Sequence, residues 1–189
     1  MRYLPNMLSI LRMLMVVPVV WALASGRFGI ALGLYAAAGV SDALDGAIAK
    51  RWGWSSRLGA LLDPAADKLL VLGTYTTLAV EHRVPWWLIG LMFARDFVIV
   101  SGAAIYRWRR GPFVIQPALS SKVTTGLLIV VGVALVVQGL HPWLSVAGEN
   151  ILVGILAASL CVSGGDYLLN WGMRFLRERS LAPRDDSTF

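Results

Sequence analysis

Charged residues are scarce in this chain. Only 15% of its 189 residues are charged and 57% are hydrophobic, whereas a soluble domain carries about 25% charged residues. The mean hydropathy is +0.67. This shortage of charge excludes an ordinary soluble domain and predicts a protein whose solvent is the lipid bilayer.

Cysteine is almost missing as well, since Cys161 is the one residue of its kind. A single cysteine excludes a disulfide framework, and because Cys161 lies in an apolar run we expect a buried, inert thiol. The sequence also lacks internal repeats, low-complexity tracts and any break in composition that would mark a second domain. We therefore expect one membrane domain over residues 1–177 and a polar tail over residues 178–189.

Six apolar segments approach the roughly 20 residues that a helix needs to cross a membrane. Turn-forming residues separate them, among them Ser25-Gly26 and His141-Pro142. The sequence thus predicts an all-α, polytopic membrane protein with six transmembrane helices. The expected spans are residues 7–24, 28–49, 58–80, 86–106, 119–140 and 151–175.

The first span has a second interpretation. Arg2, the apolar stretch and Ala22-Leu23-Ala24 resemble a secretory signal with its cleavage site. Because the later segments are just as apolar, we favour a first spanning helix that is retained.

Basic residues are distributed unevenly between the connecting segments. Eleven of them fall on one side of the predicted layout, and only Arg27 and Arg83 fall on the other. Because cytoplasmic loops carry the excess of Lys and Arg, both termini and the tail are predicted to be cytoplasmic, with the chain in the inner (cytoplasmic) membrane. The net charge of +6 then suits anionic lipid headgroups, and nucleic acid is not expected as a partner.

Six acidic residues lie inside the predicted spans, although one unpaired charge at the centre of a membrane costs roughly 2.5–3.5 kcal/mol. Almost all of them are predicted to lie in the cytoplasmic half of the membrane. Such a group requires a polar cavity, a bound metal or mutual pairing. These residues are Asp42, Asp45, Asp63, Asp67, Asp96 and Asp166.

Four of these acids fall on two consecutive predicted helices. Asp42 and Asp45 are three residues apart and share one helix face. Asp63 and Asp67, four residues apart, share a face on the next helix. A short turn joins the helices, so the pairs can meet, and four carboxylates in one place repel unless a cation binds. Oxygen-only ligands favour Mg²⁺ or Mn²⁺, and two such ions could clamp a pyrophosphate.

Ion pairing and ion transport account for the acids less well than a metal does. Ion pairs with Lys68, Arg95 and Lys122 would leave some of the carboxylates without a cation, because the acids outnumber the nearby bases. A cation-coupled transporter also needs intramembrane carboxylates, but it predicts charges in both halves of the membrane and an inverted repeat. The sequence has neither feature.

The segment from residue 42 to residue 67 resembles a family signature. It reads D-x2-D-G-x2-A-K-x8-G-x3-D-x3-D, and the CDP-alcohol phosphotransferases carry this pattern with Arg at the position of Lys50. Lys keeps the charge but lacks the bidentate fork of Arg, although Arg51 follows immediately. Pro5-Asn6 and Arg12 are also similar to the start of that family, and the six-span layout extends the resemblance over nearly the whole chain.

The resemblance implies the CDP-alcohol phosphotransferase fold and an enzyme of phospholipid biosynthesis. Its members are six-helix homodimers that transfer a phosphatidyl group from CDP-diacylglycerol to an alcohol and release CMP at the cytoplasmic membrane surface. It implies that Asp42, Asp45 and Asp63 bind metal, and that Asp67 is the catalytic base and a further metal ligand. The implied nucleotide contacts are Asp42, Gly46, Ala49, Lys50 and Gly59.

The second half of the chain bears on the acceptor. Arg95-Asp96 and the stretch from Pro117 to Thr125 are similar to the cardiolipin synthases of the family, although Thr124 replaces their usual Asn. This similarity favours phosphatidylglycerol as the acceptor. The stretch over residues 163–167 is instead similar to the phosphatidylglycerophosphate synthases, so glycerol-3-phosphate stays open as the alternative.

Four basic residues are candidates for binding the phosphate of the acceptor or of the lipid. Two of them have competing interpretations: Arg95 could pair with Asp96 or Asp166 to hold helices together, and Arg12 could anchor the chain at the membrane interface. The four candidates are Arg95, Lys122, Arg12 and Arg51.

Overall fold

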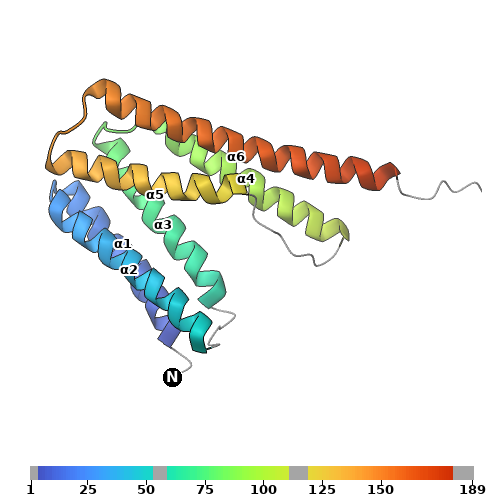
Figure 1. Cartoon of the computed structure of the whole chain (residues 1–189), viewed down its shortest axis with the longest axis horizontal. Helices are drawn as coiled ribbons and strands as arrows, with labels where there is room; N and C mark the ends of the chain where they lie inside the picture. The colour runs from blue at the N-terminus through green and yellow to red at the C-terminus, as the bar shows by residue number, and fades with distance from the viewer. Residues whose placement is uncertain (1–3, 53–58, 111–118, 181–189) are drawn as a thin grey trace, which may run out of the picture. The chain divides into compact units, whose positions relative to one another are not determined.

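The computed structural model contains six α-helices within the residues that it describes, which are 4–52, 59–110 and 119–180 (Figure 1). The side chains of residues 4–9, 12, 42–64, 106, 109, 110 and 170–180 are outside the description. The helices are α1 (Leu4–Ala24), α2 (Phe28–Trp52), α3 (Gly59–Val80), α4 (Trp86–Arg110), α5 (Leu119–Leu140) and α6 (Val146–Ser180).

The helices confirm the all-α prediction, and five of them lie within a few residues of the expected spans. The exception is α6, which begins at Val146 rather than 151 and continues into the predicted tail as far as Ser180. Ser145 explains the early start, because its hydroxyl accepts a hydrogen bond from the Gly148 N–H at 3.3 Å and so caps the helix. The sequence prediction begins later because Glu149 and Asn150 make the first turn polar.

Three helices carry segments long and apolar enough to cross a membrane, within the part of the chain that the structure describes: Trp86–Ile105, Leu119–Leu140 and Val146–Leu169. Shorter apolar stretches in α1 and α2 cover Met13–Ala24 and Phe28–Ser41. Large apolar side chains also face outward, with Val17 69% and Phe97 73% exposed. Outward apolar faces of this kind suit lipid rather than water, as expected of a membrane protein.

The prediction of a buried Cys161 is wrong, because this free cysteine is exposed. It lies on α6 beside Val162, which is 65% exposed, whereas Leu160 and Ser163 are buried. In a membrane helix the outward face is apolar too, so an apolar neighbourhood does not indicate burial. Cys161 therefore belongs to the outward face of α6.

The chain forms two compact units. The first unit comprises Met1–Ile89 and Leu128–Gly154, and the second comprises Gly90–Leu127 and Ile155–Phe189. Each unit has its own buried contacts.

The first unit is built around α1, which packs against both α2 and α3. Gly73 allows the close approach of α3, because a Cβ atom at this position would lie only 2.9 Å from the Val20 side chain. Leu23 of α1 and Tyr35 of α2 belong to one buried apolar cluster with Leu70 of α3. This cluster fixes the faces that α2 and α3 turn toward α1.

Two helices of the first unit end in the same way. At the end of α1, Gly26 adopts a positive φ of 68°, and the Arg27 N–H bonds to the Ala22 carbonyl at 2.8 Å. At the end of α3, His82 adopts a φ of 58°, and the Arg83 N–H bonds to the Leu78 carbonyl at 2.9 Å. Both endings are Schellman caps, which satisfy carbonyls that the helix leaves unpaired.

Candidate functional site

Both predicted carboxylate pairs lie on helices of the first unit. Asp42 and Asp45 are part of α2, and Asp63 and Asp67 are part of α3. The two helices run in opposite directions (Figure 1). The helical backbone on which the shared-face argument depends is therefore confirmed. That the four carboxylates converge stays a prediction, since three of them are among the side chains not described.

For most other predicted site residues, too, the structure describes the backbone and not the side chain. Their backbone falls in helices, but their side chains lie outside the described ones, so their roles stay predictions. These residues are Arg12 on α1, Gly46, Ala49, Lys50 and Arg51 on α2, and Gly59 on α3.

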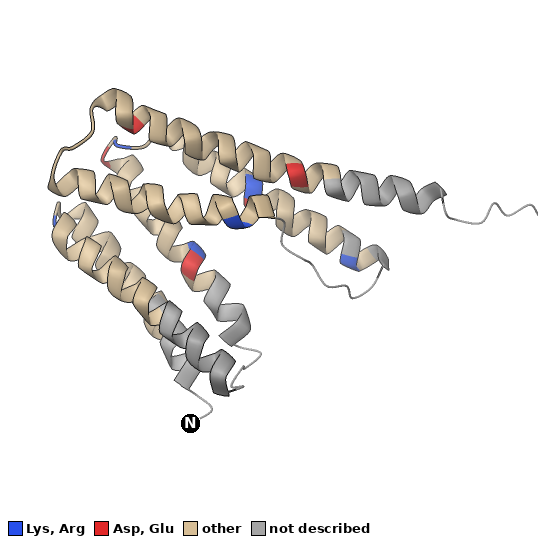
Figure 2. Cartoon of the chain, viewed as in Figure 1, with Lys and Arg blue, Asp and Glu red and all other residues tan. Residues whose placement is uncertain are grey.

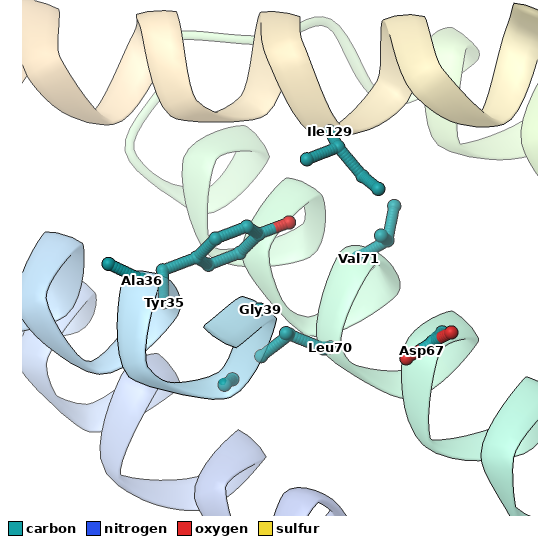
Figure 3. A pocket seen from close by; sticks show the side chains of 8 residues that line it. Tyr35, Ala36, Gly39, Asp67, Leu70, Val71 and Ile129 are labelled. Atoms are coloured by element: carbon teal, nitrogen blue, oxygen red, sulfur yellow. The ribbon is translucent and has the colours of Figure 1, made fainter. Parts of the chain in front are cut away.

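Asp67 has a described side chain, which is exposed at the edge of a pocket in the first unit. The pocket has a volume of about 270 Å³ and lies between α2, α3 and the part of α5 that belongs to this unit (Figure 3). Its wall is apolar apart from Asp67 and Tyr35. The lining residues are Tyr35, Ala36, Ala38, Gly39, Asp67, Leu70, Val71 and Ile129.

The Tyr35 hydroxyl is the unusual polar group of this pocket. Tyr35 is only 8% exposed, and its hydroxyl oxygen has no hydrogen-bond partner among the described residues. The Thr74 hydroxyl lies near it but donates to the Leu70 carbonyl at 2.8 Å. By contrast Tyr75, fully buried in the same unit, donates to the Leu128 carbonyl at 2.9 Å. A buried hydroxyl without a partner costs free energy, so Tyr35 marks a place where a ligand group would be stabilising.

No group of three or more His, Cys, Asp or Glu that could hold a metal occurs among the side chains that the structure describes. This finding does not bear on the predicted centre, because Asp42, Asp45 and Asp63 are not among them. The chemistry of the donor set fits a hard divalent cation, since carboxylates offer oxygen ligands alone.

The second unit holds a different polar cluster, centred on Arg95 of α4. Its guanidinium is 2.8 Å from the Asp96 carboxylate and donates to the Ser121 hydroxyl of α5 at 2.6 Å. It also reaches the Ser163 hydroxyl of α6 at 3.3 and 3.4 Å. Arg95 is only 9% exposed, yet each nitrogen of its fork has a partner. The predicted pairing with Asp96 is confirmed, and Arg95 joins three helices.

Two further bonds connect α5 and α6 in this unit. The Ser120 hydroxyl donates to the Asp166 carboxylate at 2.7 Å, and the buried Thr124 hydroxyl donates to the Ser159 carbonyl at 3.0 Å. These contacts agree with the interpretation of Asp166 as a residue that packs helices. Lys122 lies on the same helix and is exposed. Figure 2 shows that charged residues are few on the described parts of the helices.

Sequence reasoning missed Tyr35, Ser120 and Ser121 as members of polar sites. Ser121 gave a partial signal, because a serine in the first turn of an apolar span can bond a charged side chain on a neighbouring helix, but no local pattern identifies that partner. Tyr35 gave no signal, since a tyrosine among alanines and leucines is an ordinary core residue.

The amino-acid sequence is similar to a family model and to several known proteins. A family model described as CDP-alcohol phosphatidyltransferase matches residues 2–162. The cardiolipin synthase (CMP-forming) of Streptomyces coelicolor is 39% identical over 110 residues, which cover 55% of this chain and 51% of that protein. The human cardiolipin synthase (CMP-forming) is 36% identical over 110 residues, covering 58% of this chain and 36% of that protein.

A relative with another acceptor in its name is also similar. The CDP-diacylglycerol–glycerol-3-phosphate 3-phosphatidyltransferase of Escherichia coli K12 is 34% identical over 116 residues, which cover 56% of this chain and 59% of that protein. The chain thus spans about half the length of the curated relatives that it matches. Because the family match extends over most of the sequence and includes both carboxylate pairs, the chain belongs to the CDP-alcohol phosphatidyltransferase family.

Proposed function

We propose that this chain is an integral membrane enzyme of phospholipid biosynthesis that transfers a phosphatidyl group from CDP-diacylglycerol to phosphatidylglycerol, giving cardiolipin and CMP. The observation that carries the proposal is the family match over residues 2–162, which includes the complete D-x2-D…D-x3-D signature. The cardiolipin synthases among the relatives support the choice of acceptor.

In this proposal Asp67 is the catalytic base. It takes the proton from the acceptor hydroxyl, whose oxygen forms a bond to the lipid-side phosphorus as the bond from that phosphorus to the CMP oxygen breaks. The electron pair of the broken bond leaves with CMP. The exposed position of Asp67 at the edge of an apolar pocket supports this role, since a base must be reachable from the lipid phase.

The family generally depends on a divalent metal. We assign Mg²⁺ or Mn²⁺, as two ions, to Asp42, Asp45, Asp63 and Asp67. When bound, such ions would neutralise the pyrophosphate and the charge that develops on the leaving oxygen. Each pair sits at helix spacing on its own helix, so its two carboxylates could bind the same ion.

The cytidine diphosphate is assigned to the α2 segment that follows the first carboxylate pair and to the start of α3. Gly46 and Gly59 lack side chains, so the nucleotide can approach the backbone there. Lys50 supplies a positive charge where the family pattern has Arg. The full set of contacts is Asp42, Gly46, Ala49, Lys50 and Gly59.

Lys122, Arg12 and Arg51 are assigned to the phosphate of the acceptor or of the lipid. Arg95 is the fourth candidate by sequence, but its guanidinium is occupied by Asp96, Ser121 and Ser163. We therefore give Arg95 the role of a positioning residue, which holds α4, α5 and α6 together and acts on the acceptor site through them.

We further propose six membrane-spanning helices with both termini and the active site on the cytoplasmic side, and a homodimer. Three of the six helices are apolar enough to span within the described residues, which supports the layout. The excess of Lys and Arg in one set of connections supports the orientation. A cation-coupled transporter is disfavoured by the family to which the chain belongs.

CMP release tests the proposal. The purified chain in detergent or liposomes should release CMP from CDP-diacylglycerol when phosphatidylglycerol and Mg²⁺ or Mn²⁺ are present, and excess EDTA should abolish the release. The assay should be repeated with glycerol-3-phosphate, inositol and serine as acceptors. Absence of CMP with every acceptor would disprove the proposed enzyme.

Phosphatidylglycerophosphate synthase is the second candidate. The similar Escherichia coli relative and the stretch over residues 163–167 favour it. Thin-layer separation of the products decides between the two, because cardiolipin forms only from phosphatidylglycerol and phosphatidylglycerophosphate only from glycerol-3-phosphate.

A further inference from the structure

We infer that the pocket beside Asp67 holds the glycerol-proximal part of one acyl chain of the CDP-linked lipid donor, and that Tyr35 donates a hydrogen bond to the ester carbonyl of that chain. This inference rests on the proposed function and adds a ligand group and a binding residue to it.

The volume and wall of the pocket define the kind of occupant. Sites for whole drug-sized molecules measure about 300–1,000 Å³, and this pocket has about 270 Å³. It therefore accommodates a fragment of a lipid and not the whole molecule. Its wall of alanine, glycine, leucine, valine and isoleucine suits methylene groups.

The unpartnered hydroxyl adds a polar requirement to this apolar space. Figure 3 shows the Tyr35 ring extending from α2 across the pocket, with its hydroxyl toward the side on which Val71 and Ile129 lie. A purely apolar chain would leave this donor unsatisfied. An acyl ester satisfies both conditions, because a carbonyl acceptor is followed immediately by methylene groups. A tyrosine hydroxyl can donate to such a carbonyl.

Access to the hydroxyl requires a small side-chain movement. The oxygen exposes less than 1 Å² in the structure, so a carbonyl reaches it only when part of the wall turns aside. Ile129, one of the lining residues, is 44% exposed and can change rotamer. Exposed side chains change rotamer within nanoseconds, so this movement is no barrier to binding.

The position of the pocket favours the donor lipid over the acceptor lipid. Its lining residues on α2 and α3 lie on the helices that carry the two carboxylate pairs, and Asp67 is itself at the edge. The donor pyrophosphate must sit at the carboxylates, so its glycerol backbone begins within reach of this pocket.

Ester and ether lipids test the role of Tyr35. CMP release is measured with CDP-linked lipids that carry either acyl esters or alkyl ethers of equal length. Wild type should prefer the ester by about two- to tenfold in kcat/KM, the range expected of one hydrogen bond. Tyr35→Phe should reduce this preference to near one and leave the ether rate unchanged. Equal preference in the two proteins overturns the inference.

Two further comparisons distinguish a wrong lipid assignment from a wrong proposed function. If changing the acceptor from ester to ether gives the Tyr35-dependent effect, the assignment to the donor is overturned. If wild type releases no CMP from either donor with any acceptor, the proposed function fails. A wild type that turns over while Tyr35→Phe behaves identically overturns only the acyl-ester site.

Filling the pocket gives a second test with a matched control. Gly39 lines the pocket and Gly33 does not, and both lie on α2 with no heavy atom within 4 Å of an added Cβ. Gly39→Leu should raise the KM for a long-chain donor several-fold more than the KM for a short-chain donor. Gly33→Leu should change neither value. An equal response of the two variants overturns the assignment of the pocket.

Discussion

Arg95 of the second unit and Tyr35 of the first unit are both buried polar side chains, and they differ in whether the protein satisfies them. In the second unit, Arg95 is buried and engages Asp96, Ser121 and Ser163, so the charge is satisfied by the protein itself. In the first unit, the Tyr35 hydroxyl is equally buried and has no partner among the described residues.

This difference separates structural polar groups from binding groups. A satisfied network has little to gain from a ligand, because any new contact must first break an existing bond. An unsatisfied buried donor gains a full hydrogen bond when a ligand arrives. The comparison therefore predicts losses of stability in the second unit and losses of activity in the first.

Asp67→Asn should have the largest effect on activity. Without a base to take the acceptor proton, kcat should fall by about 10²–10⁴-fold, measured as CMP release under saturating substrates. Binding of the nucleotide, measured by the thermal shift that CDP produces with Mg²⁺ present, should persist. The melting temperature without ligand should stay close to that of wild type, because Asp67 is exposed. Turnover near the wild-type rate would show that another group is the base.

Arg95→Ala should have the largest effect on stability. The substitution removes the side chain that connects α4, α5 and α6, and it removes the cation beside the Asp96 carboxylate. Together these losses should lower the free energy of unfolding by about 2–4 kcal/mol. Thermal unfolding in detergent measures the loss. Arg95→Lys is the matched control, since it keeps the charge but not the fork, and its loss should be intermediate. An unchanged melting temperature with a raised KM for the acceptor would instead make Arg95 a phosphate ligand.

The sequence predicted the helical framework of the chain better than its chemistry. Six helices and two carboxylate pairs at helix spacing follow from hydropathy and from the i+3 and i+4 rule. The inward face of each helix does not follow, because a membrane helix is apolar all round. Cys161, expected inside for this reason, lies outside, and Tyr35 resembles one more core residue.

In the second unit, too, the sequence predicts only part of the polar cluster. The pair Arg95-Asp96 is visible in the sequence, and its pairing is one of two that the sequence predicts. The serines that complete the network come from two other helices, 26 and 68 residues further along the chain. No local pattern encodes such distances, so the network required the structure.

Ser121→Ala should have a smaller effect on the second unit. It removes the 2.6 Å bond to Arg95, and interhelical hydrogen bonds in membrane proteins contribute about 0.6 kcal/mol on average and at most about 1.7 kcal/mol. The melting temperature should fall modestly. Ser101→Ala is the control, because its hydroxyl bonds the Phe97 carbonyl of its own helix at 2.6 Å. Equal losses in the two variants would mean that the bond between helices adds nothing.

Tyr35→Phe should have the smallest effect on stability and gives the sharpest contrast with Ser121→Ala. Both changes delete one hydroxyl, but the Tyr35 hydroxyl is buried without a partner among the described residues. Its removal ends a desolvation penalty, so the free energy of unfolding without lipid should stay constant or rise by up to about 1 kcal/mol. Thermal unfolding of lipid-free protein measures this. A loss as large as that of Ser121→Ala would mean that the protein already satisfies this hydroxyl, and Tyr35 and Arg95 would then not differ in this respect.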